Sequence, residues 1–396
     1  MKHPRLVAAL VAGVSLPALA ACTGNSSSSD QGDSRTMNVT SSDDACELSA
    51  DTAPAGRLVF KVKNTGSKVT EFYLYAADGK RIIGEAENIG PGLSRSLVVN
   101  APAGKYVPAC KPGMTGEGIR STFTVTKSGE KSNASAVVQK QIDAANEQYH
   151  AYVEDEAGQL LTGTKQFVAA YKAGDDAKAR ELYAATRVHW ERIEPVAESF
   201  GDLDPKMDAR EADLEEGQKW TGWHRLEKDL WPPSNGTGDQ KYTALTKAQR
   251  ATYADRLMAD THTLHGRIEE LSFTVDQIGN GAKSLLDEVA TGKVTGEEEI
   301  WSHTDLYDFQ ANVDGARVAY EGLRPVLKVK NPALDSELEQ RFAALQTLLD
   351  KYRTGSGDAA GFVSYEKLGD AEVKQLSDAV NALSEPLARL TAAVTV

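Results

Sequence analysis

The hydrophobic and polar positions of this chain follow two different periods, one in each half. From about Asn38 to Val125, short apolar runs alternate residue by residue with polar positions, as in RLVFKVKNTG and TEFYLYAADGK, and each run ends on turn residues. Period-two alternation with turns at this spacing predicts an antiparallel β-sandwich. The sequence therefore predicts a small all-β domain over residues 38–127.

The second half has the spacing of helices. After a polar linker predicted at residues 128–137, apolar residues between Ile142 and Val153 recur at steps of three and four, which gives one apolar stripe along a helix. Similar stripes follow, separated by Gly and Pro residues, at 177–200, 247–272, 306–329, 333–353 and 372–395. We therefore predict an all-α bundle of several long helices over residues 138–396.

The first residues predict export. A short basic start precedes an apolar run from Leu6 to Ala21, which is the pattern of a signal peptide at residues 1–21. The end of this run, LAAC, resembles the bacterial lipobox, in which the cysteine (here Cys22) is lipid-modified; the alternative is an ordinary secretion signal with a stray cysteine. The serine-rich stretch that follows suits a flexible tether at residues 22–37. We expect a protein anchored by lipid on the outer face of the cytoplasmic membrane.

The composition favours a soluble acidic protein. The 396 residues carry a formal net charge of -13, and removal of residues 1–21 takes away two positive charges, which leaves about -15. An acidic surface argues against nucleic acid as a partner and mildly favours cations.

The predicted β domain contains two cysteines. Cys46 and Cys110 would both lie outside the cell, where disulfides persist, so a disulfide is one interpretation. The other is a metal site in which the two thiolates are joined by nearby carboxylates such as Glu71 and Glu87. The loop CKPGM is similar to a cupredoxin copper loop, but none of the seven histidines lies between Cys46 and Met114. Because a blue-copper site needs two imidazoles, an ordinary blue-copper carrier is excluded.

The predicted helical domain carries acidic and histidine side chains at helical spacing. Glu191 and Glu194 are three residues apart, and His224 and Glu227 in GWHRLEK have the same spacing, so each pair would share one helix face. A third segment, EEEIWSHTDLYDFQANVDGA, carries His303, Asp305, Asp308 and Asp314 in a helix predicted to start near Ser302.

Each pair alone is more often a solvated surface pair than a site. Tryptophans beside two of them, Trp190 and Trp223, indicate that both segments pack inward and carry their polar neighbours to a partly buried place. Buried carboxylates need a counter-charge, which a cation supplies. Hard oxygen ligands with a single imidazole suit iron, manganese or calcium better than copper(I), and a histidine with two carboxylates can also hold zinc.

Several long motifs resemble one family in the same order along the chain. HWERIEPVAESFGDLD, DARE, GWHRLEK, SHTDLYDFQANVDGA and KYRTGSG are similar to the imelysin-like, M75-type helical domain of EfeO-class iron-uptake lipoproteins, and CEL, ENIGPG and Cys110 are similar to the cupredoxin-like domain of that class. The resemblance implies a cupredoxin-like sandwich followed by an imelysin-like bundle.

The same resemblance implies a role and a set of ligands. The protein would bind iron, as Fe2+ or Fe3+, and work with a membrane iron permease and a dye-decolourising-type haem peroxidase. Its metal ligands in the helical domain would be His224 and Glu227, together with Glu191, Glu194 and Asp208. The small domain would bind copper or iron through Cys46, Cys110 and acidic residues, which would include Glu71 and Glu87.

Two other functions are alternatives to iron capture. The M75 label suggests a metallopeptidase, but no HExxH motif is present, and His262 and His265 have no matching general base nearby. A redox role, in which the small domain oxidises Fe(II), needs a metal held by free Cys46 and Cys110. We therefore expect a binding protein rather than an enzyme.

Overall fold

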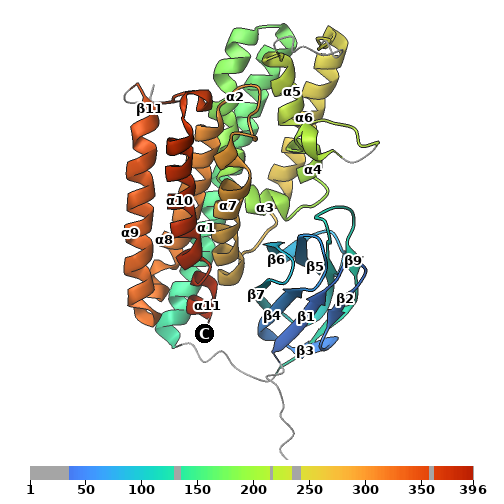
Figure 1. The fold of residues 1–396 in the computed structure, drawn as a ribbon, viewed down its shortest axis with the longest axis vertical. Helices are drawn as coiled ribbons and strands as arrows, with labels where there is room; N and C mark the ends of the chain where they lie inside the picture. Colours follow the sequence, from blue (N-terminus) through green and yellow to red (C-terminus); the bar gives the residue numbers. More distant parts are fainter. Residues whose placement is uncertain (1–34, 129–134, 215–216, 234–241, 356–360, 396) are drawn as a thin grey trace, which may run out of the picture. The chain divides into compact units, whose positions relative to one another are not determined.

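The computed structural model describes residues 35–128, 135–214, 217–233, 242–355 and 361–395. These residues form β-sheets over residues 36–126, followed by helices over residues 136–395 (Figure 1). The predicted order, an all-β part followed by a helical part, is confirmed; the helical part also contains a short antiparallel pair of strands, β11 (Arg353–Thr354) and β12 (Gly361–Phe362). The predicted signal peptide and Cys22 lie outside the described residues, as does most of the predicted tether.

The β part consists of two sheets. One has the strand order β2-β1-β4-β7 and the other the order β3-β10-β8-β5-β6, with β9 paired to β8. The strands are β1 (Thr36–Ser41), β2 (Cys46–Leu48), β3 (Thr52–Pro54), β4 (Gly56–Asn64), β5 (Thr70–Ala76), β6 (Ile82–Ile89), β7 (Ser94–Ala101), β8 (Gly104–Cys110), β9 (Ile119–Arg120) and β10 (Phe123–Thr126). Pairing is antiparallel as predicted, except that β1 runs parallel to β4 and β3 parallel to β10.

The core of this part forms where the alternating apolar residues face inward. Along β4, Leu58, Phe60 and Val62 are fully buried, while Lys61 and Lys63 are exposed. Phe60 contacts Phe72 and Phe123 with ring centroids 5.4 and 5.5 Å apart. The period-two pattern in the sequence is therefore the pattern of side chains pointing into and out of a sandwich.

The second part is a bundle of long helices with its own core. The helices are α1 (Ala136–Ala173), α2 (Asp176–Glu191), α3 (Glu194–Glu198), α4 (Asp204–Met207), α5 (Trp223–Leu230), α6 (Lys247–Ile268), α7 (Val275–Thr291), α8 (Asp305–Lys330), α9 (Pro332–Leu349), α10 (Asp370–Leu387) and α11 (Leu390–Thr395). None of the helices in the described residues is both long and apolar enough to span a bilayer.

One predicted helix is in fact two. The stripe predicted over 177–200 is interrupted, because α2 ends at Glu191 and α3 begins at Glu194 with Pro195 in its first turn. A proline at this position is compatible with a helix start but not with a helix interior. Glu191 and Glu194 therefore lie at the end of one helix and the start of the next, and the prediction that they share a helix face is wrong.

Candidate metal centre

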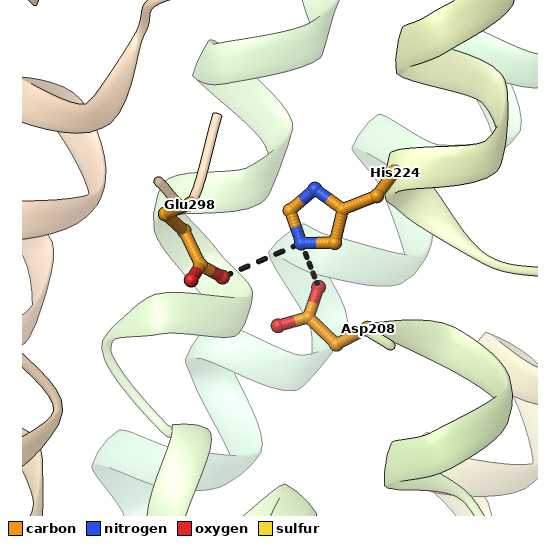
Figure 2. Close-up of side chains that lie close together, drawn as sticks. All are labelled: Asp208, His224 and Glu298. Atoms are coloured by element: carbon orange, nitrogen blue, oxygen red, sulfur yellow. Dashed lines mark ion pairs between the residues drawn. The ribbon is translucent and has the colours of Figure 1, made fainter. Parts of the chain in front are cut away.

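His224 lies at the centre of a buried group of acidic side chains. It is fully buried on α5, directly after the fully buried Trp223, as the adjacent tryptophan led us to expect. Its Nε2 atom lies 3.3 Å from Oε1 of Glu298 and 3.5 Å from Oδ1 of Asp208. Figure 2 shows the imidazole nitrogen facing both carboxylates, which come from separate segments of the chain.

A glycine brings two of these segments together. Gly222 precedes α5 with φ +89°, and a Cβ at this position would overlap the backbone carbonyl of Met207 at the end of α4. Only glycine tolerates both the positive φ and this close approach. The contact holds the start of α5 against the end of α4, so His224 meets Asp208, the residue directly after α4.

Glu227 holds the imidazole from its other side. Its carboxylate lies 3.3 Å from Nδ1 of His224, at hydrogen-bond distance, and accepts hydrogen bonds from the backbone N–H groups of Trp301 and Ser302 at 3.1 and 2.7 Å. Burial raises the pKa of Glu227, but its bonds to His224 and Ser302 outweigh this effect, so the pKa is lowered. A ligating histidine is commonly oriented by such a carboxylate on its second nitrogen. Nε2 is therefore the nitrogen free to face a cation.

Three groups of potential ligands occur among the described residues, and all belong to the helical part. They are Asp208–His224–Glu298, His224–Glu227–Glu299 and Glu191–Glu194–Asp208, and within each group the ligand atoms lie within 4.8 Å of one another. The groups share His224 and Asp208, so they form one continuous centre. We call these residues the acidic centre: Glu191, Glu194, Asp208, His224, Glu227, Glu298 and Glu299.

Two buried cations neutralise part of the acidic centre. Arg187 is fully buried and forms ion pairs with Glu191, Asp208 and Glu299, the last at 2.6 Å. It also lies 3.5 Å from Glu298, so Arg187 and His224 face two of the same carboxylates. Lys293, two residues after the end of α7, is the second cation and lies 2.7 Å from both Glu191 and Glu194. Burying this many carboxylates without opposite charge would be very costly.

The protonation of the centre depends on these neighbours. Burial and the charge of Arg187 lower the pKa of His224, but bonds to Glu227 and Glu298 and the charge of Asp208 outweigh them and raise it to about 10. Burial raises the pKa of Glu298, but His224, Lys293 and Arg187 together hold it well below its usual range. Burial and the charge of Glu227 raise the pKa of Glu299 well above its usual range.

Several buried polar atoms beside the acidic centre lack a hydrogen-bond partner among the described residues. They include Oδ2 of Asp305 and both carboxylate oxygens of Asp308, of which Oδ1 lies 3.8 Å from Nε of Arg187. Such atoms are uncommon in folded proteins and need a physical reason, for which a bound ion is one candidate. The imidazole of His224 and the carboxylates of Asp208 and Glu298, whose ligand atoms lie within 4.8 Å of one another, are donors that fit a hard divalent or trivalent cation.

The structure brings together all five residues that the sequence predicted as helical-domain ligands. Of the third predicted segment, Asp305 and Asp308 are buried, whereas Asp314 is 36% exposed and His303 pairs with Glu366 at 3.3 Å on the surface. The helix carrying them starts at Asp305 rather than near Ser302. His262 is exposed and His265 lies 3.6 Å from Glu269, so neither belongs to the acidic centre.

Four members of the site were missed by sequence reasoning. Glu298 and Glu299 belong to a run of three glutamates, a pattern that usually indicates a solvated segment, yet only Glu297 of the three is exposed. Arg187 and Lys293 were missed because an isolated basic residue in a helical pattern is typical of a surface. One sequence signal could have identified Glu298 and Glu299: the run of glutamates lies just before the SHTDLYD motif.

In the small domain, the two cysteines form the disulfide that was one of the two interpretations of the sequence, not the metal site that was the other. Cys46 of β2 and Cys110 of β8 form a disulfide, with Cα atoms 5.5 Å apart, that links the two sheets. The prediction that these cysteines bind a metal is therefore wrong for this form, because a disulfide sulfur carries no thiolate. Of the two carboxylates, Glu71 is buried and accepts a hydrogen bond from the Tyr73 hydroxyl at 2.9 Å, and Glu87 is half-buried.

The fold and the acidic centre together define a two-domain protein with a cupredoxin-like part and an imelysin-like part. The cupredoxin-like domain model matches residues 15–125, and the imelysin model of the M75 peptidase family matches residues 145–390.

Curated proteins match the chain along most of its length. The protein named iron uptake system component EfeO from Escherichia coli O1:K1 / APEC is 40% identical over 357 residues, which cover 89% of this chain and 90% of the relative. Proteins of the same name from Escherichia coli O157:H7 and Shigella flexneri are 39% identical over the same lengths. This chain belongs to the EfeO family.

Proposed function

We propose that this protein is the extracytoplasmic iron-binding component of an iron-uptake system, and that it captures iron at the acidic centre. Support for the role comes from relatives that are named iron uptake system components and match 89% of the chain. Support for the site comes from one observation above all: the Nε2 atom of the fully buried His224 lies within 3.5 Å of both Asp208 and Glu298, which come from separate segments of the chain.

The ligand chemistry favours iron over copper. Asp208 and Glu298 supply hard oxygen donors and His224 supplies one imidazole, a set that suits Fe2+ or Fe3+. Glu227 would hold the imidazole in place through Nδ1 and anchor the backbone of residues 301 and 302, which follow Glu298 closely. The sequence prediction that Glu227, Glu191 and Glu194 also contact the ion stays a prediction. Zinc would fit the same donors in vitro.

Capture would proceed by exchange of positive charge. In the protein without iron, Arg187 and the protonated His224 neutralise Asp208 and Glu298. An arriving iron ion would replace the proton on His224 and compete with Arg187 for the two carboxylates. The centre thus remains neutralised before and after binding, which allows an acidic site to be buried without collapsing the bundle.

The wider role rests on the family likeness. We propose that Cys22 carries a lipid that holds the protein on the outer face of the cytoplasmic membrane, that the iron is passed to a membrane permease, and that a dye-decolourising-type haem peroxidase is a further partner. Binding of copper or iron by the small domain would have to use Glu71 and Glu87 without the cysteines, since these form a disulfide.

Metal titration of single variants tests the proposed site. We expect His224→Ala and Glu298→Gln each to weaken Fe2+ binding by about 100-fold or more in anaerobic calorimetry, since each removes a ligand. Glu297→Gln is the matched control, because it removes an exposed glutamate next to Glu298 and should leave binding unchanged. Wild-type affinity in both His224→Ala and the double variant His224→Ala/Glu227→Ala would remove the site.

A further inference from the structure

The ammonium group of Lys293 lies where a second metal ion would be expected. Its Nζ atom lies 2.7 Å from Oε2 of Glu191 and 2.9 and 2.7 Å from the two oxygens of Glu194. The two contacts with Glu194 are hydrogen bonds that the ammonium group donates, and the contact with Glu191 is an ion pair. Lys293 is fully buried, at the first residue of the short helix η2 (Lys293–Thr295).

The surrounding pocket has the composition of a metal subsite. Glu191 and Glu194 are two of the three members of one potential ligand group, and its third member, Asp208, also belongs to the group around His224. A carboxylate shared by two groups is the arrangement of a bridging ligand between two ions. Helical bundles that hold two metal ions draw their ligands from glutamates and from Glu/His pairs three residues apart, the residue types present here.

A buried amide completes the pocket. The side-chain N–H2 of Asn312, on α8, donates to Oε2 of Glu191 at 3.2 Å and to Oε2 of Glu194 at 2.9 Å. Its Oδ1 atom is buried and has no hydrogen-bond partner among the described residues. The amide therefore presents its N–H2 group, not its oxygen, to the two carboxylates, and rotation of the amide would turn Oδ1 toward a cation held between them.

We propose that Lys293 is a tethered cation that takes the place of a second metal ion and so limits the acidic centre to one bound ion. This inference rests on the proposed function, because it concerns a second subsite of the same centre. Removal of the ammonium group would take away the cation that pairs with Glu194 and would leave Glu191 with Arg187 alone, and a divalent cation would restore the lost positive charge. Lys293 is thus a residue that determines the metal stoichiometry.

Counting bound Mn2+ in the mature full-length protein tests this proposal. Lys293→Met keeps the length of the side chain up to the ammonium group and removes its charge, and we expect it to bind one equivalent more than the wild type. The electron paramagnetic resonance signal of free Mn2+ gives the number of equivalents bound by each protein. An ion bound by the small domain would be counted equally in the variant and in the wild type, so it does not affect the difference between them. Lys293→Arg, which keeps a cation, should bind the wild-type number.

Two further variants separate the possible causes. The triple variant Lys293→Met/Glu191→Gln/Glu194→Gln lacks the carboxylates and should lose the additional equivalent. Lys293→Gln serves the same test if the methionine variant does not fold, and it should also gain one equivalent. A folded Lys293→Met or Lys293→Gln variant that binds the wild-type number would overturn the proposal.

A failure of the Lys293 proposal can be distinguished from a failure of the proposed iron site around His224. In a His224→Ala background, Lys293→Met should still gain one equivalent, because Glu191 and Glu194 do not depend on the imidazole. A gain in that background supports the Lys293 subsite even if His224→Ala itself has no effect on the wild-type site. Loss of binding in His224→Ala without any gain from Lys293→Met supports the site around His224 alone and contradicts the second subsite.

Discussion

At the scale of single residues, His224 is the group on which the account depends. It is the only imidazole in the acidic centre formed by the described residues, and its two nitrogens have different surroundings. Nδ1 faces Glu227, which is fixed by backbone donors, and Nε2 faces Asp208 and Glu298. This division of roles sets both the orientation of the ring and its charge.

Iron binding should release at least one proton near neutral pH. The raised pKa of His224, about 10, means that the imidazole is protonated at pH 7 and must lose its proton to ligate a metal. Apparent affinity should therefore rise by up to about tenfold per pH unit between pH 6 and 9. Calorimetry in buffers of different ionisation enthalpy measures the released protons. Binding heats that do not depend on the buffer would contradict this charge state.

The same shift has a consequence for the metal-free protein. Because the folded-state pKa of His224 is above its ordinary value of 6.5, the stability that its charge contributes is fully present below about pH 6.5. This contribution is lost as the pH rises through about 10. Metal binding and the stability of the metal-free fold therefore respond to pH in opposite directions over this range.

Sequence reasoning found the residues whose spacing or neighbours carry a signal. His224 and Glu227 were found from their helical spacing and from Trp223 beside them, and Glu191 and Glu194 from their spacing beside Trp190. Asp208 came from the family resemblance alone. Arg187, Lys293, Glu298 and Glu299 were not found, because what buries them is contact between segments far apart in the sequence.

At the scale of elements, the centre is built from helix ends rather than helix faces. Glu191 ends α2, Glu194 begins α3, Asp208 directly follows α4, and His224 lies in the first turn of α5. The sequence predicted the helices from their apolar stripes but joined α2 to α3, because the apolar spacing alone does not show that Pro195 lies in the first turn of a new helix. The periodic pattern shows which face of a helix is buried. It does not show the direction of the side chains at the ends of helices, where the chain changes course.

The contact between α4 and α5 makes Gly222 a test of this arrangement. Gly222→Ala should destabilise the protein by roughly 1–3 kcal/mol through backbone strain alone, and should weaken iron binding because the new Cβ pushes His224 away from Asp208. Urea unfolding and calorimetry measure the two effects. Gly217→Ala is the control: φ is +83° and nothing lies within 4 Å of the added Cβ, so it should cost stability but leave iron affinity unchanged. Unchanged affinity in Gly222→Ala would contradict this role of the contact.

At the scale of the whole molecule, the two parts differ in their capacity for metal chemistry. The period-two and helical patterns predicted both parts and their order, since each pattern reports directly on which side chains are buried. The patterns could not decide between a disulfide and free thiols at Cys46 and Cys110, which depends on whether β2 and β8 come close in space. With these cysteines joined in a disulfide, the redox hypothesis lacks the thiolates that it requires, and our proposal places iron at the acidic centre of the helical part.

The position of iron in the loaded protein tests the central claim most directly. Crystals of the full-length mature protein soaked anaerobically in Fe2+ would be measured on both sides of the iron absorption edge, and the anomalous difference map would locate each ion. We expect one peak in the helical part, within about 2.3 Å of Nε2 of His224 and bound by Asp208 and Glu298. Iron found only at the small domain or on the surface, with His224 still paired to the two carboxylates, would contradict the account.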